Sequence, residues 1–299
     1  MAKRKIIITG ANGQLGFDLI KSFSNEYEIF PVDVQDFDIR DYSKIDSCLK
    51  RFKPDIVIHS AANTNVDDCE SNAELAMSIN ATGTEYIARA CHEIGARMIY
   101  FSTDYVFDGQ KRSPYKEDDS PHPVNIYGRS KLEGEIAVQT YLSNFAILRI
   151  AWLYGAHGRN FVKTIIRLGN RQLNEKRAGR KTSPIEIVDD QIGNPTWTME
   201  VVNQTRAIIE NGLEEVIHCT SGGETSWYKF ARAIFQNLAM PVDIRPCRTD
   251  EHPRPAKRPS YSSLENKLLK EYNLNIMRHH DEALREFLSQ HGEGLKNEI

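Results

Sequence analysis

The chain has 299 residues, of which 40% are hydrophobic and 26% charged, and its net charge is −3. These values are typical of a soluble globular protein with one large or two moderate domains. The slightly acidic balance argues against a nucleic-acid-binding protein with a strongly basic surface. No stretch has the pattern of a signal peptide or a membrane span, so we expect a cytoplasmic protein that does not insert into membranes.

The cysteines are five in number, widely spaced and without a Cys-x-x-Cys pair. This pattern favours reduced thiols in a cytoplasmic protein over a disulfide framework. No combination of His and Cys has the spacing of a metal site, so we predict no metal centre. The cysteines are Cys48, Cys69, Cys91, Cys219 and Cys247.

The N-terminal half alternates short β-rich runs with longer helical patterns, which is typical of a parallel sheet with crossover helices. The expected strands are 5–8, 27–32, 56–59, 97–101 and 145–150. The expected helices are 15–23, 43–52, 73–94 and 126–141. We therefore predict an α/β fold with a doubly wound parallel sheet in residues 1–150.

The alternation becomes less regular after about residue 150. We expect helices at 226–238 and 281–288, a solvated basic turn at 176–181 and an extended cationic loop at 245–259. We predict that residues 151–299 form mainly a smaller C-terminal α/β substrate domain, from which segments can return to the main sheet.

A glycine-rich turn follows the first expected strand and precedes the first expected helix. Its G-x-x-G-x-x-G spacing allows a tight turn, close backbone approach to a pyrophosphate and close packing of helix on strand. The helix that follows offers free N–H groups and the positive end of its dipole. These features predict a Rossmann-type dinucleotide site. Its expected contacts are Gly10, Asn12, Gly13, Gln14, Leu15 and Gly16.

Asp33 closes the second expected strand, 23 residues after Gly10. A carboxylate there accepts hydrogen bonds from the ribose hydroxyls and repels a 2′-phosphate, which favours NAD(H). Arg40 lies close in sequence and can accommodate that phosphate, so both NADH and NADPH stay open. Further contacts are expected at Asp38, Ile39, Ala61, Ala62 and Asn80. For Asn80, a hydrogen bond between helices is an equally good explanation.

Tyr127 and Lys131 are spaced i and i+4, which places them on one helical face, and Thr103 precedes the tyrosine by 24 positions. An ammonium beside a phenol favours the phenolate, so we expect Lys131 to lower the pKa of Tyr127. The threonine hydroxyl adds a third hydrogen-bonding group for a carbonyl or alcohol oxygen. The three side chains predict redox chemistry at a C–O bond.

Together these segments resemble the extended short-chain dehydrogenase/reductase family, and finer features resemble its dTDP-4-dehydrorhamnose reductase branch. The matching runs are 61–67, 102–109, 125–135, 149–155, 160–161, 190–196 and 254–260. The resemblance implies NAD(P)H-dependent reduction of the C4 ketone of dTDP-4-dehydro-6-deoxy-L-mannose to dTDP-L-rhamnose, a precursor of surface polysaccharides. Tyr127 would donate the proton, Lys131 would also bind the nicotinamide ribose, and Thr103 would polarise the carbonyl.

The same resemblance implies a set of side chains that contact the dTDP-sugar. For Trp152, a place in the core is the alternative. The arginines of the cationic loop suit a diphosphate, which guanidinium groups can bind in bidentate fashion. The expected substrate contacts are Val66, Thr103, Asp104, Tyr105, Tyr127, Trp152 and Arg258.

The chain departs from the family pattern at three places, one of which is a longer and more basic connection at 172–184. Ile150-Ala151 replaces the common Thr-Ser pair. Gln14 stands in the glycine-rich turn, where some relatives carry an acidic residue that binds Mg²⁺ at a dimer contact. The sequence therefore does not support Mg²⁺, and both a monomer and a homodimer stay open.

Three other functions occur within the same fold, and the sequence argues firmly against the first of them. A dehydratase would need a glutamate after Asp104, where this chain has Tyr105. A non-catalytic subunit would resemble the regulatory subunit of methionine adenosyltransferase, but Thr103, Tyr127 and Lys131 are intact. A reductase or epimerase that acts on another nucleotide sugar would share most of the residues named above.

Overall fold

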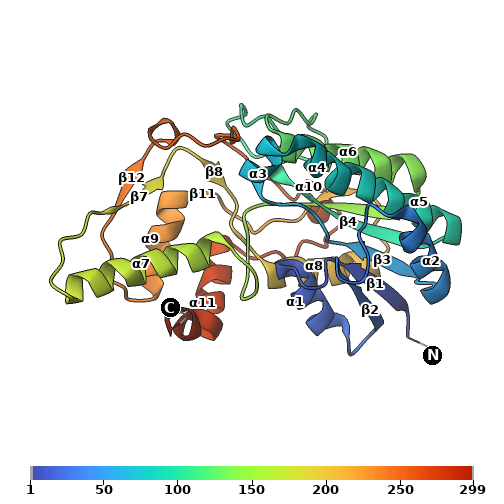
Figure 1. The fold of residues 1–299 in the computed structure, drawn as a ribbon, viewed down its shortest axis with the longest axis horizontal. Helices are drawn as coiled ribbons and strands as arrows, with labels where there is room; N and C mark the ends of the chain where they lie inside the picture. The colour runs from blue at the N-terminus through green and yellow to red at the C-terminus, as the bar shows by residue number, and fades with distance from the viewer. Residues whose placement is uncertain (1–2, 298–299) are drawn as a thin grey trace.

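The computed structural model, which describes residues 3–297, contains a six-stranded parallel sheet, whose strands β1 to β4 are labelled on the right of Figure 1. Its strand order is β10-β5-β4-β3-β1-β2, and every neighbouring pair is parallel. The predicted α/β fold with a Rossmann-type parallel sheet is confirmed. The strands are β1 Lys5–Thr9, β2 Glu28–Val32, β3 Ile56–His59, β4 Arg97–Thr103, β5 Phe145–Ile150 and β10 Val216–His218.

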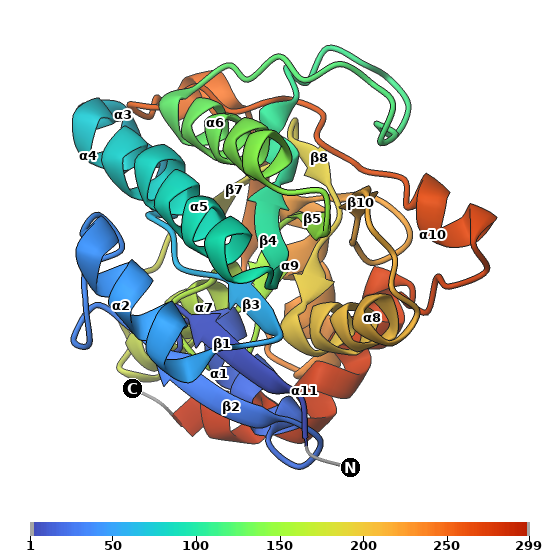
Figure 2. The same cartoon turned by 90° about the vertical axis from the view of Figure 1, so that its right-hand side faces the viewer.

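Helices cover both faces of this sheet, as Figure 2 shows end-on. Successive strand residues point to opposite faces, so Ile6 and Ile8 join one apolar core and Ile7 joins the other. One face carries α1 Gln14–Phe23 and α8 Thr198–Glu210. The other carries α2 Tyr42–Phe52, α5 Thr84–Ile94 and α6 Ile126–Tyr141.

The helix predicted at 73–94 is present without a gap, but its middle turns are π-helical instead of α-helical. It consists of α4 Ala73–Met77, a π-helical segment η1 Ser78–Gly83 and α5, and the unpredicted α3 Val66–Ser71 precedes it. Within η1, the Asn80 side chain bonds to the Asn63 backbone and to the Ser130 hydroxyl of α6. These bonds tie the segment to its neighbours, which is a physical reason for the wider turn.

The C-terminal part adds a third apolar core between helices and short strand pairs. The helices predicted at 226–238 and 281–288 are present as α9 and α11, the latter longer than expected. Residues 176–177 end α7 instead of lying in a turn, and 245–247 belong to β12 instead of a loop. The helices are α7 Phe161–Arg177, α9 Trp227–Asn237, α10 Lys267–Glu271 and α11 His280–Asn297. The short strands are β6 Leu153–Tyr154, β7 Ile185–Val188, β8 Ile192–Gly193, β9 Thr196–Trp197, β11 Thr225–Ser226 and β12 Ile244–Cys247.

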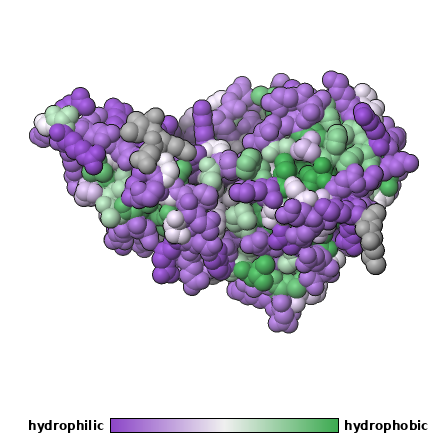
Figure 3. All heavy atoms as spheres, turned by 90° about the horizontal axis from the view of Figure 1, so that it is seen from below, coloured by the Kyte–Doolittle hydropathy of each residue, from purple (hydrophilic) through white to green (hydrophobic). Residues whose placement is uncertain are grey.

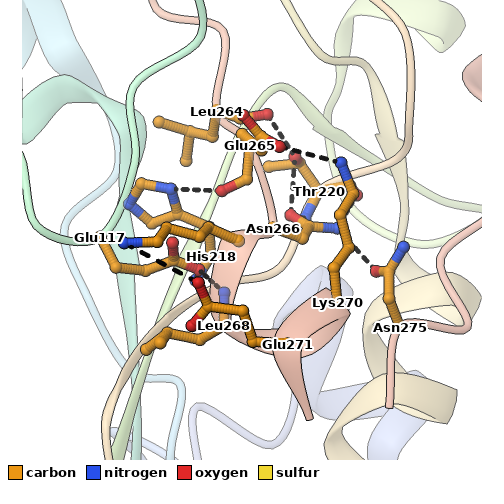
Figure 4. A network of polar contacts seen from close by, with 11 residues as sticks. Glu117, His218, Thr220, Leu264, Glu265, Asn266, Leu268, Lys270, Glu271 and Asn275 are labelled. Atoms are coloured by element: carbon orange, nitrogen blue, oxygen red, sulfur yellow. Dashed lines mark hydrogen bonds and ion pairs between the residues drawn. The ribbon is translucent and has the colours of Figure 1, made fainter. Parts of the chain in front are cut away.

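A buried polar network holds β10 in the main sheet (Figure 4). Glu117 Oε1 accepts a hydrogen bond from the His218 backbone N–H at 3.1 Å, and His218 Nδ1 bonds to the Glu265 carbonyl at 3.0 Å. Asn266 binds Thr220 through both its amide nitrogen and its amide oxygen. These bonds connect the outer strand of the sheet to the segment that leads into α10.

The surface seen in Figure 3 is mainly hydrophilic, with hydrophobic side chains in several separate areas. Within residues 3–297, no helix is both long enough and apolar enough to cross a membrane. All five cysteines are free thiols.

Candidate functional site

Three adjoining cavities lie along the carboxyl ends of the sheet strands and the C-terminal segments. The central cavity, of about 520 Å³, is lined by the glycine-rich turn together with Thr103, Tyr127 and Lys131. The acidic cavity, of about 440 Å³, shares Gly10 and Gly13 with it and contains the end of β2. The C-terminal cavity, of about 1130 Å³, shares Tyr105 and Trp227 with the central cavity. The carboxyl edge of a parallel sheet is where ligands bind in open α/β folds.

Two glycines of the turn are required by close backbone contacts. Gly10 has φ +69°, and a Cβ there would lie 2.7 Å from the Ala61 backbone nitrogen. At Gly16 a Cβ would lie 2.1 Å from the Gly10 carbonyl oxygen. The bare backbone and the start of α1 therefore face the central cavity, in the arrangement that fits a dinucleotide pyrophosphate.

The acidic cavity is lined by the residues predicted for the adenosine end of the cofactor. They include Asp33, Asp38, Ile39, Arg40, Ala61 and Ala62. Asp33 Oδ2 accepts a hydrogen bond from the Asn12 backbone N–H at 2.8 Å, which fixes the turn to the end of β2. Arg40 pairs with Asp38, and this hydrogen bond lowers the pKa of the Asp38 carboxyl. Asp33 forms no ion pair within residues 3–297, and its carboxylate oxygens accept only backbone N–H groups among the hydrogen bonds described.

The three residues predicted to be catalytic meet in the central cavity. Thr103 is the last residue of β4, and Tyr127 and Lys131 lie on the first turns of α6. Asn125 caps that helix by accepting a hydrogen bond from the Gly128 backbone N–H at 2.8 Å. The Thr103 hydroxyl lies within hydrogen-bonding reach of the Tyr127 phenol. Lys131 is almost fully buried, with its Nζ 4.2 Å from the centre of the Tyr100 ring.

Burial has a larger effect on the pKa values of Tyr127 and Lys131 than the charge of a neighbouring group. Desolvation raises the pKa of Tyr127 above its ordinary value, against a smaller lowering effect of the Thr103 hydrogen bond. Desolvation also lowers the pKa of Lys131 to about 7, opposed by the Glu135 carboxylate. The predicted lowering of the Tyr127 pKa by Lys131 is therefore wrong for the chain without cofactor. The phenol is protonated at neutral pH, which is the state that a proton donor requires.

An ion pair that the sequence analysis missed lies behind Lys131. Glu135 and Arg149 are 1% and 4% exposed, and Arg149 Nη2 lies 2.7 Å from Glu135 Oε2. The Ser102 hydroxyl donates to the same carboxylate at 2.5 Å. Glu135 follows Lys131 by one helical turn, and this i, i+4 spacing was the signal that could have identified it.

Trp152 lines the central cavity, which favours a place in the site over the alternative of a core aromatic. Its φ is +45°, and its indole stacks on Trp227 with ring centroids 3.5 Å apart and planes 5° apart. Gly193 is needed beneath it, because a Cβ there would lie 2.5 Å from the indole. Val66 and Tyr105 line the same cavity. The sequence analysis did not identify Trp227.

The C-terminal cavity contains the cationic loop. Arg254, Lys257 and Arg258 line it, and Arg258 forms two hydrogen bonds to the Asp67 carboxylate, at 3.0 and 2.9 Å. The pair holds the loop against α3 and lowers the pKa of Asp67. The loop thus presents its cations next to Tyr105, at the junction with the central cavity.

Comparison with known proteins identifies the family. The model of the RmlD substrate binding domain matches residues 4–292. This chain belongs to that family. It is 41% identical to a dTDP-4-dehydrorhamnose reductase from Clostridium acetobutylicum, with a TM-score of 0.91 over 96% of this chain and 99% of that one. A dTDP-4-dehydrorhamnose reductase from Bacillus anthracis, solved in complex with NADP, is 38% identical with the same TM-score and coverage. A dTDP-4-keto-6-deoxy-D-glucose reductase from Streptomyces niveus is 37% identical over 93% of this chain and 94% of its own length. The predicted resemblance to the dTDP-4-dehydrorhamnose reductases is confirmed.

Asn80 is placed differently from the other predicted cofactor contacts of this RmlD-family chain. It is fully buried and lines neither the central nor the acidic cavity. Its amide is engaged by Asn63 and Ser130, at 2.8 to 2.9 Å. These bonds agree with the alternative of a hydrogen bond between helices, and a direct contact of Asn80 with the cofactor stays a prediction.

Gln14 and the Ile150-Ala151 departure also lie in the central cavity. The Gln14 side chain donates to the Leu153 carbonyl at 3.2 Å and accepts from Asn160 at 2.7 Å. It thus joins the glycine-rich turn to the C-terminal part, and its amide offers no carboxylate to Mg²⁺.

Proposed function

We propose that this protein is an NAD(P)H-dependent reductase that converts dTDP-4-dehydro-6-deoxy-L-mannose to dTDP-L-rhamnose. The observation that carries the proposal is the meeting of Thr103, Tyr127 and Lys131 in one cavity with the glycine-rich turn. The names of relatives that are 37 to 41% identical support the same substrate class. Residues 1–150 would bind the cofactor and 151–299 mainly the sugar nucleotide, in the cytoplasm. One chain supplies all the side chains named above, which suits a monomer or a homodimer.

The chain's own residues protonate and orient the substrate. The reduced nicotinamide, when bound, supplies the hydride. The Tyr127 phenol donates its proton to the alkoxide oxygen, a contribution of roughly 10²–10⁴-fold. The Thr103 hydroxyl polarises the ketone, and the Lys131 ammonium stabilises the charge that develops on the tyrosine.

The nucleoside diphosphate fits the C-terminal cavity. Arg254 and Lys257 line this cavity, and Arg258, anchored by Asp67, lies at its junction with the central cavity. Charge-assisted hydrogen bonds from guanidinium groups suit the oxygens of a diphosphate. The sugar would then lie between Val66, Tyr105 and Trp152.

A second candidate substrate is supported by one relative. The Streptomyces niveus protein is named a dTDP-4-keto-6-deoxy-D-glucose reductase and is as similar as several rhamnose-pathway relatives. That reaction would use the same proton donor on a sugar of different configuration. Turnover with each of the two keto sugars, measured by NADH or NADPH oxidation, distinguishes the candidates. A non-catalytic cofactor-binding subunit would oxidise neither cofactor with either sugar.

Tyr127→Phe tests the proposed proton donor. We expect cofactor affinity close to that of the unaltered protein and a loss of turnover by about 10²-fold or more, because the variant keeps the ring but lacks the hydroxyl that donates the proton. Tyr141→Phe, at the far end of α6, is the matched control and should keep turnover. Undiminished turnover of Tyr127→Phe would remove this residue from the mechanism.

A further inference from the structure

The Thr103 hydroxyl has a single proton, which it can donate either to the Asp104 carboxylate or into the central cavity. A threonine hydroxyl donates one hydrogen bond and accepts two. Thr103 Oγ1 accepts from the Tyr105 backbone N–H at 3.2 Å and lies 3.0 Å from Asp104 Oδ1. The Tyr127 phenol lies within hydrogen-bonding reach of the same hydroxyl, and both residues line the central cavity.

The direction of the Thr103 proton follows from the charge of Asp104. An ionised carboxylate can only accept, so it takes the Thr103 proton and leaves none for a ketone oxygen. A neutral carboxyl can donate to Oγ1. Both acceptor positions of Oγ1 are then occupied, by Tyr105 and Asp104, and its proton must point elsewhere.

We propose that Asp104 is a positioning residue whose neutral form donates a hydrogen bond to Thr103 and thereby directs the Thr103 proton to the substrate carbonyl. The proposal rests on the reductase function given above and adds to it a residue that acts through Thr103. It requires Asp104 to be neutral in the productive state, whereas a carboxylate that acted as a base would have to be charged.

The surroundings of Asp104 favour that neutral form. Asp104 is 2% exposed, and it forms no ion pair within residues 3–297. The groups that face it are Tyr105 in η2 Asp104–Val106, Tyr127 in α6 and the Ser262 hydroxyl, with Lys131 in the same cavity. Burial raises the pKa of Asp104 to about 7, against the lowering effect of the Ser262 and Thr103 hydroxyls. A raised pKa keeps the carboxyl neutral below pH 7 and lets it ionise above.

Asp104→Asn tests whether activity depends on the neutral form of Asp104, because asparagine resembles that form and does not titrate. The asparagine amide donates as a protonated carboxyl does, but it cannot ionise. Lys131 also has a pKa of about 7, so in the unaltered protein Asp104 and Lys131 both lose the proton that activity requires as the pH rises above 7. We expect its kcat/KM for the keto sugar to fall by about 100-fold per pH unit well above pH 7, and that of Asp104→Asn by about tenfold. Asp118→Asn, at an exposed aspartate, is the control and should keep the steeper slope.

An infrared titration of the protein without cofactor gives a readout independent of turnover. We expect a band of protonated carboxyl that disappears through pH about 7 and is missing from Asp104→Asn. The proposal is overturned if this band is the same in both proteins, if the variant keeps the steeper slope, or if the folded variant binds cofactor but is inactive at every pH. If the unaltered protein turns over neither sugar but its carboxyl band still titrates, the proposed reductase function is refuted, whereas the ionisation of Asp104 is supported.

Discussion

The Asp33 carboxylate provides both a hydrogen bond and a negative charge, and substitution by asparagine removes only the charge. One oxygen holds the glycine-rich turn through the Asn12 backbone N–H, and the carboxylate charge faces the acidic cavity. Asparagine can keep the first contact through its amide oxygen but carries no charge. The hydrogen bond and the electrostatic effect can therefore be tested apart.

Asp33→Asn should shift the cofactor preference toward NADPH. We expect the KM for NADPH to fall and that for NADH to rise, each by about tenfold, because a 2′-phosphate no longer meets a like charge. Steady-state kinetics with both cofactors measures the shift. Asp36→Asn is a nearby control with the same loss of charge, since its carboxylate lies outside the acidic cavity's lining residues. An unchanged ratio of the two KM values would contradict the assignment of Asp33 to the ribose.

At the scale of elements, the π-helical segment η1 fixes the position of α6. Asn80 bonds to Ser130, which lies one residue before Lys131 on that helix. The π-helical segment between α4 and α5 could not be predicted, because the apolar periodicity of 73–94 continues through it. In this segment Asn80 bonds to Asn63 and to Ser130 of α6, which are far away in sequence, and no local pattern reports such contacts.

Asn80→Ala should lower kcat while leaving cofactor affinity close to its original value. Loss of the buried hydrogen bonds should also reduce the free energy of unfolding by about 1–3 kcal/mol. Urea unfolding and cofactor titration measure the two effects. Ser78→Ala, which loses a hydroxyl that donates to the Leu75 carbonyl in the same region, serves as the control. A large loss of cofactor affinity in Asn80→Ala would instead support the direct contact with the cofactor.

The sequence predicted elements best where their pattern is long and regular. The strand at 56–59 and the helix at 126–141 agree with β3 and α6, and the glycine-rich turn leads into α1. The three-residue strand β10 gave no signal, because its pairing with β5 depends on the fold of the whole chain. Trp227 was missed for a similar reason: it reaches the cavity through a stack on Trp152, far away in sequence.

At the scale of the whole molecule, two buried histidines couple folding to pH. Burial lowers the pKa of His59 and of His218 to about 3, the former also beside the Lys131 ammonium and the latter beside Arg149. An unfolded histidine titrates near 6.5. Between these values the unfolded chain binds protons that the folded chain does not, so the free energy of unfolding decreases as the pH falls. The raised pKa of Asp104 acts in the opposite direction.

His218→Gln isolates one of these contributions. We expect the free energy of unfolding to depend less steeply on pH, by about 1.4 kcal/mol per pH unit between pH 5.5 and 4. Urea unfolding at several pH values measures the slope, and a His122→Gln variant, altered at an exposed site, serves for comparison. Equal slopes for His218→Gln and the unaltered protein would show that His218 is charged in the folded state.

The place of β10 at the outer edge of the sheet has a consequence for synthesis on the ribosome. Five strands of the sheet are complete once residue 150 has left the ribosome, but β5 then has an open edge. Its partner is translated only 66 residues later, several seconds at usual elongation rates. During that interval the nascent chain carries an unpaired, apolar strand edge, the kind that pairs with other chains. A chaperone bound to the emerging chain would protect it until β10 and its polar network close the edge.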